Sequence, residues 1–128
     1  MTPSLYPVSD RLDCTVSCDG GDMSVTFEGT VDFYTAGKAK KLLLSLLDHE
    51  PARLTIDAKG AFVDSAGIGV FLHVAQRARL ERRSFRLLCD ERLQQLLRLH
   101  QLDAVLGISD AVPETGLRTP SSTGRLAA

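Results

Sequence analysis

The sequence lacks both an excess of charge of either sign and any long apolar run. Fifteen Lys and Arg residues offset sixteen Asp and Glu residues, so the formal net charge is −1. A chain so balanced has no bulk attraction for a polyanion such as a nucleic acid, or for acidic lipid headgroups. The longest apolar stretches are about three residues, such as Leu42-Leu43-Leu44, far short of the ~20 that span a membrane. We therefore expect no nucleic-acid partner and no membrane insertion.

Cysteine is scarce, and a secretory signal is missing from the start of the chain. Three cysteines cannot form a complete disulfide framework. The first residues, Met-Thr-Pro-Ser-Leu-Tyr-Pro, lack the basic and apolar regions of a signal peptide. The 128 residues are 44% apolar and 24% charged, which suffices for one domain with a real core. We expect a single cytoplasmic domain.

The residue types that carry chemistry are present, but their spacing does not favour catalysis. Cys14 and Cys18 are four apart in a predicted strand and Cys89 is remote, so no zinc quartet is spaced correctly. Ser65 opens a helix after a strand, as in a hydrolase, but its context is Val63-Asp64-Ser65-Ala66-Gly67 rather than Gly-x-Ser-x-Gly. The chain has neither a Walker sequence nor a Gly-x-Gly-x-x-Gly loop for a nucleotide. The sequence therefore predicts no enzyme, no bound metal and no cofactor.

The spacing of apolar residues predicts the fold class. Two partly alternating runs, 13–18 and 23–29, flank the turn Asp19-Gly20-Gly21-Asp22 and indicate a β-hairpin. The apolar period then switches between 3.6 and 2. The segments that follow are helix, strand, helix, strand and helix, over residues 35–49, 53–58, 65–82, 84–89 and 91–100. This order implies an α/β fold in which helices pack on a mixed β-sheet with an N-terminal hairpin.

The two ends of the chain carry weaker patterns. Residues 1–11 contain two prolines and show no periodicity, which predicts a flexible arm. The apolar residues 104–108 could form a last strand or the start of a final helix. Residues 113–128 are rich in turn formers and poor in large apolar side chains, which predicts a disordered tail. The folded domain is expected over residues 12–112.

The segment Phe62-Val63-Asp64-Ser65-Ala66-Gly67-Ile68-Gly69-Val70 places two glycines in the first turns of a predicted helix. Each costs up to about 1 kcal/mol of helix stability relative to alanine. Two explanations stay open: the turn packs tightly against the sheet, or the backbone of a partner approaches it. The N-terminus of a helix tolerates a phosphate, so Ser65 is a candidate for modification, although many serines there only cap the helix.

This segment resembles the signature of the STAS family, and within it of the bacterial anti-sigma-factor antagonists. In that signature a hydrophobic pair precedes Asp-Ser-Ser-Gly-Leu-Gly-Val. A second stretch, Gly29-Thr30-Val31-Asp32-Phe33-Tyr34-Thr35-Ala36, is similar to the family's Gly-x-Leu-Asp-x-x-Thr-Ala. The resemblance covers about residues 12–110, and one position departs from it, because the family's second serine is Ala66 here.

The resemblance implies a STAS-like fold and a switch protein that is not an enzyme. Such an antagonist binds an anti-sigma factor that is also a serine kinase, and so releases the sigma factor. The kinase phosphorylates the serine after the aspartate, here Ser65, and a PP2C-type phosphatase removes the phosphate. The implied partner-binding residues are Asp32, Thr35, Asp64, Ser65, Ala66, Gly67, Ile68 and Gly69.

Two other roles within the family stay open. The chain could be a protein-binding subunit of a lipid- or anion-transport complex, or a scaffold or small-ligand domain of another signalling system. Neighbouring genes would separate the antagonist from the transport subunit. A GHKL-type kinase or PP2C-type phosphatase gene would favour the antagonist, and transport ATPase genes would favour the transport subunit.

Overall fold

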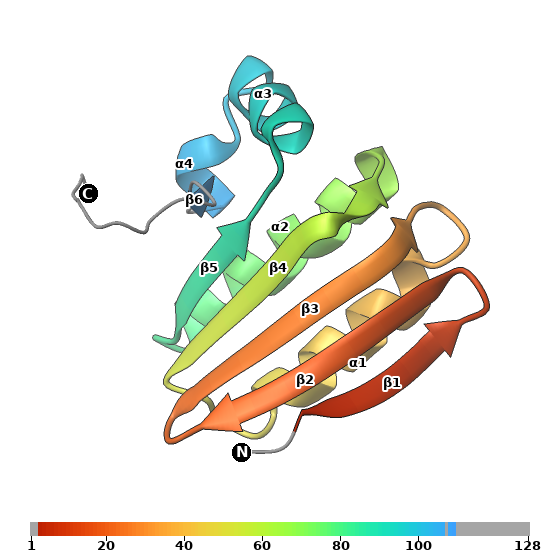
Figure 1. Ribbon diagram of the computed structural model, residues 1–128. Helices are drawn as coiled ribbons and strands as arrows, with labels where there is room; N and C mark the ends of the chain where they lie inside the picture. Colours follow the sequence, from red (N-terminus) through yellow and green to blue (C-terminus); the bar gives the residue numbers. More distant parts are fainter. Residues whose placement is uncertain (1–2, 107, 110–128) are drawn as a thin grey trace.

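A single mixed sheet organises the part of the chain that the structure describes. The structure is a computed structural model and describes residues 3–106 and 108–109 (Figure 1). The six strands lie in the order β1-β2-β3-β4-β5-β6. They are β1 (Ser4–Ser9), β2 (Leu12–Asp19), β3 (Asp22–Val31), β4 (Arg53–Val63), β5 (Ser84–Leu88) and β6 (Ile108–Ser109). The first two pairings are antiparallel and the other three are parallel, so the prediction of a mixed sheet is confirmed.

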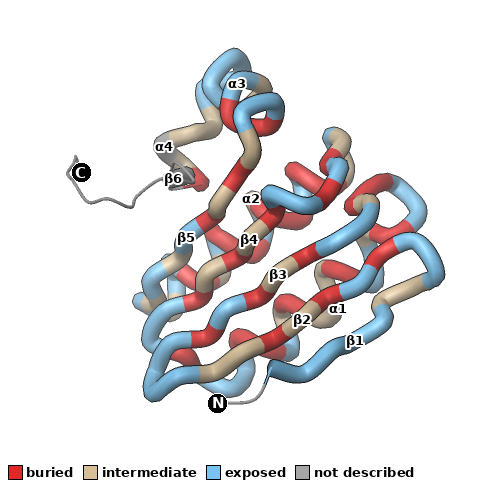
Figure 2. Tube along the Cα trace, viewed as in Figure 1, coloured by how far each residue is buried: buried red, intermediate tan, exposed pale blue. Residues whose placement is uncertain are grey.

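The long helices pack on one face of this sheet. The helices are α1 (Ala36–Leu47), α2 (Ser65–Leu80), α3 (Glu91–Leu99) and α4 (Asp103–Leu106). In Figure 1, α1 and α2 lie behind the sheet. The core lies between the two layers, where the rings of Phe27 in β3 and Phe71 in α2 are 6.2 Å apart. Along the strands buried and more exposed residues alternate (Figure 2), because one face of the sheet packs on the helices and the other does not.

The predicted hairpin is confirmed. β2 and β3 pair from Leu12 opposite Gly29 to Asp19 opposite Asp22. Gly20, in the two-residue turn between them, has a φ of 63°, a conformation that glycine adopts without a steric penalty.

The expectation of a flexible arm over residues 1–11 is wrong for residues 4–9. Residues Ser4–Ser9 form β1, which pairs antiparallel with β2 and places Tyr6 opposite Cys14. β1 is an edge strand, and an edge strand tolerates proline because one side of its backbone needs no ladder partner. Its first residues are exposed on both faces, so the strand carries no alternation of apolar and polar residues.

The strand predicted over residues 53–58 is too short. β4 continues to Val63 and stays paired with β3 to the end, with one register shift between Thr26 and Glu28 of β3. Its extra residues include the exposed Lys59 and Gly60, which interrupt the apolar pattern. The added length brings the end of β4 level with the end of β3.

At the C-terminal end, both alternatives for residues 104–108 are partly confirmed. Asp103–Leu106 form the short helix α4, and Ile108–Ser109 form β6 beside β5. The predicted tail over residues 113–128 lies outside the described residues. Within the described part of the chain, no helix is long and apolar enough to cross a bilayer.

Candidate functional site

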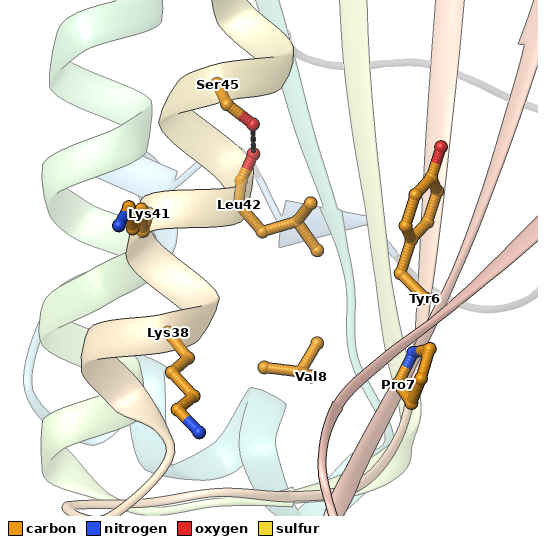
Figure 3. Close-up of a pocket in the computed structure, with 7 residues that line it drawn as sticks. All are labelled: Tyr6, Pro7, Val8, Lys38, Lys41, Leu42 and Ser45. Atoms are coloured by element: carbon orange, nitrogen blue, oxygen red, sulfur yellow. Dashed lines mark hydrogen bonds between the residues drawn. The ribbon is translucent and has the colours of Figure 1, made fainter.

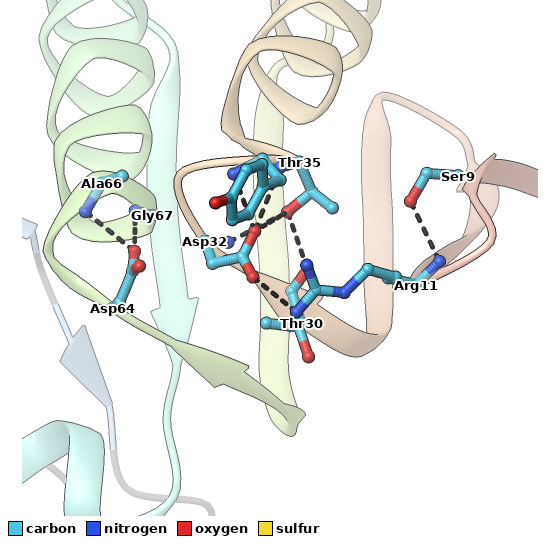
Figure 4. Close-up of polar contacts among 9 residues, drawn as sticks. Ser9, Arg11, Thr30, Asp32, Thr35, Asp64, Ala66 and Gly67 are labelled. Carbon is cyan, nitrogen blue, oxygen red and sulfur yellow. Dashed lines mark hydrogen bonds and ion pairs between the residues drawn. The ribbon is translucent and has the colours of Figure 1, made fainter.

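The two sequence motifs meet at the carboxyl ends of β3 and β4. Val31 lies opposite Val63 in the parallel pairing. The N–H of Asp64 donates a hydrogen bond of 3.2 Å to the carbonyl of Val31. Asp32 and Asp64 are the next residues after the paired valines, so the two loops begin side by side (Figure 4). In open α/β sheets this edge is where functional loops gather.

Asp64 caps the helix that carries Ser65. Its backbone is extended, and its Oδ1 accepts hydrogen bonds from the N–H groups of Ala66 (2.9 Å) and Gly67 (3.1 Å). Ser65 is the first residue of α2 and is exposed. Within the described residues no hydrogen bond engages its hydroxyl. The explanation that Ser65 serves as the helix cap is therefore wrong, because Asp64 already fills that position.

The two glycines of the motif have different surroundings. A Cβ atom added at Gly67 would lie 2.5 Å from the carbonyl oxygen of Val31 and 2.7 Å from a methyl group of Val63. At Gly69 the same atom would meet nothing within 4 Å. Tight packing against the sheet accounts for Gly67, whereas Gly69 lies exposed on the surface of α2.

A network of hydrogen bonds closes the turn between β3 and α1. Asp32 Oδ1 accepts from the N–H groups of Tyr34 (2.9 Å) and Thr35 (3.1 Å). The Thr35 hydroxyl donates to the carbonyl of Thr30 (2.7 Å) and accepts from the N–H of Asp32 (2.9 Å). The other carboxylate oxygen, Oδ2, forms an ion pair of 2.9 Å with Arg11, from the turn between β1 and β2. The motif residues of this loop therefore hold its shape (Figure 4).

This network determines the charge state of Asp32. Desolvation by itself raises the pKa of the carboxyl group. The hydrogen bonds from Thr35 and Tyr34 and the charge of Arg11 outweigh it, so the pKa of Asp32 lies below the usual value for aspartate. Asp32 is thus an anion at neutral pH.

The eight predicted site residues differ in exposure. Ser65 and Gly69 are exposed, and Asp64 and Ala66 are partly so. The buried ones are Asp32, Thr35, Gly67 and Ile68. The structure therefore brings all eight to one edge of the sheet, but only the first four present surface to a partner.

Three aromatic side chains around this edge were not among the predicted site residues. Phe33 and Tyr34 are each 77% exposed and Phe62 is 52% exposed. The rings of Phe33 and Tyr34 meet edge to face at 5.6 Å. We call Phe33, Tyr34 and Phe62 the aromatic rim. The signal for Phe62 was available in the sequence. Side chains alternate between the two faces of a strand, so that of Phe62 points to the face opposite to those of Ala61 and Val63.

Each end of the aromatic rim is covered by an arginine. The guanidinium of Arg11 lies 5.7 Å from the centre of the Tyr34 ring, and that of Arg92 lies 4.4 Å from the centre of the Phe62 ring. Arg92 also donates a hydrogen bond of 3.4 Å to the carbonyl of Val63. No sequence pattern marks either arginine, because each is distant in the chain from the aromatic ring that it contacts.

The two sequence motifs therefore meet at one edge of a mixed sheet, where Asp64 caps the helix that begins with Ser65. A sequence model of the STAS domain matches residues 14–115. The chain belongs to the STAS domain family.

Solved structures share the fold of this STAS domain. An anti-sigma factor antagonist from Mycobacterium paratuberculosis matches with a TM-score of 0.70 and 19% identity, over 80% of this chain and 87% of that one. The Bacillus cell fate determinant SpoIIAA in its phosphorylated form matches with a TM-score of 0.57 and 13% identity, over 88% and 94%. The anti-sigma factor antagonist SpoIIAA in its unphosphorylated form matches with a TM-score of 0.56 and 11% identity, over 77% and 83%. A comparison with curated protein sequences finds no significant match.

Two of the three cysteines of this STAS domain are sealed in the core. Cys14 and Cys89 are buried, and burial raises the pKa of each thiol to about 12. Neither thiol is a nucleophile at neutral pH, because the reactive form is the thiolate. In the described part of the chain no three His, Cys, Asp or Glu side chains gather as a metal site would require.

A shallow groove of about 370 Å³ lies between β1 and α1. Figure 3 shows Val8 of β1 and Leu42 of α1 pointing toward one another across it. Its lining consists of Tyr6, Pro7, Val8, Lys38, Lys41, Leu42 and Ser45. None of the eight predicted site residues lines this groove.

Proposed function

We propose that this STAS domain is a cytoplasmic anti-sigma-factor antagonist, not an enzyme, whose activity is controlled by phosphorylation of Ser65. The observation that carries the proposal is the position of Ser65. It is exposed, directly follows the capping residue Asp64, and stands at the same sheet edge as the aromatic rim. The similarity to an antagonist solved in both phosphorylated and unphosphorylated forms supports the proposal.

In the unphosphorylated state the domain binds an anti-sigma factor that is also a serine kinase, and this releases the sigma factor. The aromatic rim supplies apolar surface for the contact, and aromatic side chains are enriched in protein interfaces. The buried turn residues Asp32 and Thr35 support the contact indirectly, because they hold Phe33 and Tyr34 in place.

Phosphorylation ends the contact. The kinase transfers the γ-phosphoryl group of ATP to the Oγ of Ser65, and ADP and a proton leave. The phosphate adds about −1.5 to −2 charges at pH 7 beside the carboxylate of Asp64. Burying such charge in an interface without a partner costs several kcal/mol. A PP2C-type phosphatase hydrolyses the ester to serine and inorganic phosphate and restores binding.

The test is phosphosite mapping by mass spectrometry after incubation with ATP and the cognate serine kinase. We expect stoichiometric phosphate on Ser65 and none in Ser65→Ala. Ser84→Ala is the matched control, because Ser84 is also exposed but begins β5, whose pairing partner there is Arg53 at the start of β4. Phosphate on another residue, or unchanged binding after modification of Ser65, would contradict the switch and favour the transport-complex subunit.

A further inference from the structure

Arg92 occupies the side of β4 that β5 leaves uncovered. The pairing of β4 with β5 ends at Asp57 opposite Leu88, whereas β4 continues to Val63. In Figure 1, α3 lies beyond the end of β5, toward the end of β4. From the first turn of α3, Arg92 reaches back to the Phe62 ring (4.4 Å) and to the carbonyl of Val63 (3.4 Å). Its guanidinium therefore lies next to the backbone two residues before Ser65.

Arg92 has no carboxylate partner in the described part of the chain, because among residues 3–106 and 108–109 none lies within ion-pair distance of its guanidinium. Arg11, at the other end of the aromatic rim, by contrast already forms an ion pair with Asp32. A guanidinium has five N–H donors, and the contacts with Phe62 and Val63 use few of them. Arg92 is therefore a cation with unused capacity for an anion.

Ser65 lies on nearly the same side of α2 as Arg79, the residue that contacts α4. At 3.6 residues per turn, it lies about 40° around the helix from Arg79 and about 120° from Arg77. Arg79 donates to the carbonyl of Val105 in α4, whereas Arg77 pairs with Asp48 at the end of α1. Ser65 thus lies on the α4 side of α2 rather than on the α1 side, and α4 directly follows α3, the helix that carries Arg92.

We propose that Arg92 binds the phosphate of phosphorylated Ser65. The inference rests on the proposed function, because it assumes that Ser65 carries a phosphate. A guanidinium and a phosphate form two parallel charge-assisted hydrogen bonds, which are stronger than the single 3.4 Å bond to a neutral carbonyl. Arg92 leaves Phe62 when it turns to the phosphate. The modification then changes the aromatic rim as well as the charge beside it, and it ties the start of α3 to the start of α2.

The test needs no kinase, because phosphoserine can be incorporated at position 65 during translation. The readout is the second pKa of the phosphate, followed by ³¹P NMR during a pH titration. An unperturbed phosphoserine titrates near pH 6, and a bound guanidinium lowers that pKa because it favours the dianion. We expect Arg92→Ala to raise the phosphate pKa by about 0.3–0.7 units, as befits an exposed ion pair. Arg92→Lys should give an intermediate value, because lysine keeps the charge and loses the planar fork.

The matched control is Arg53→Ala, which removes the same charge at the opposite end of β4 and should leave the phosphate pKa unchanged. Arg92→Gln gives a second variant without the charge that keeps most of the side-chain length. Equal phosphate pKa values in the parent, Arg92→Ala and Arg92→Gln would overturn the role of Arg92 and leave the switch intact. Failure of the kinase to modify Ser65 would instead contradict the proposed function and leave the NMR result standing.

Discussion

Arg11 and Asp32 form an ion pair of 2.9 Å that joins the turn between β1 and β2 to the turn that begins α1. The backbone carbonyl of the same arginine accepts a hydrogen bond of 3.0 Å from the N–H of Thr30. The N-terminal hairpin is thereby tied to the loop that carries Phe33 and Tyr34. Changes at Asp32 are therefore expected to act on stability and on the aromatic rim together.

Asp32→Asn should weaken the dependence of stability on pH. Because the pKa of Asp32 is lowered in the folded state, its carboxylate contributes stability that is fully present above the ordinary aspartate pKa of about 4. That contribution is lost as the pH falls from there through the lower folded-state pKa. Urea unfolding at a series of pH values should show a shallower acid decline for Asp32→Asn. Asp13→Asn, an exposed site on β2, should follow the parent, and an equal effect of both changes would contradict the assignment.

Gly67→Ala should destabilise the domain, whereas Gly69→Ala should not. The new methyl group at position 67 meets the carbonyl of Val31 at 2.5 Å, and overpacking of this kind costs about 1–3 kcal/mol. At position 69 there is open space, and alanine is favoured over glycine in a helix by up to about 1 kcal/mol. Urea unfolding measures both differences. Equal stability of the two variants would contradict the close approach of α2 to the sheet.

Phosphorylation of Ser65 should weaken partner binding strongly. A net penalty of about 3–4 kcal/mol for a buried charge corresponds to a few hundredfold in Kd. Ser65→Ala should bind the anti-sigma kinase constitutively and resist modification. Ser65→Asp should bind less well than the parent, but better than the phosphorylated form, because one carboxylate carries less charge than a phosphate. Calorimetric titration of the four forms, with Ser84→Ala as control, tests this order.

Truncation of the aromatic rim should weaken the same contact without unfolding the domain. Phe33→Ala and Phe62→Ala remove side chains that are 77% and 52% exposed, so little of the core is lost. Aromatic hot spots contribute about 2 kcal/mol or more to binding, which is about 30-fold in Kd. Leu80→Ala removes a side chain that is 83% exposed at the far end of α2 and should bind as the parent does. Equal affinity of all three variants would place the partner elsewhere.

The sequence by itself determined the hairpin, the three long helices and the position of Ser65 at the start of α2. Each of these depends on neighbours within a few residues: alternation around Gly20-Gly21, apolar residues at helical spacing, and an aspartate just before a helix. Such local patterns persist in any fold that buries one face of each element. The motif residues were also predictable, because the family resemblance rests on the order of residues along the chain.

Only the tertiary structure decided which of those residues reach the surface and what stands beside them. β1 was missed because an edge strand exposed on both faces needs no alternation, and the end of β4 was missed because its polar residues break the pattern. The parallel pairing of Val31 with Val63 places Asp32 beside Asp64, and it buries Thr35 and Gly67 while leaving Ser65 exposed. Arg11 lies in the turn between β1 and β2, and Arg92 lies in α3, so both are distant in the chain from the rings that they contact. Contacts of that kind depend on strand pairing and packing across the whole sheet, which no local pattern of residues encodes.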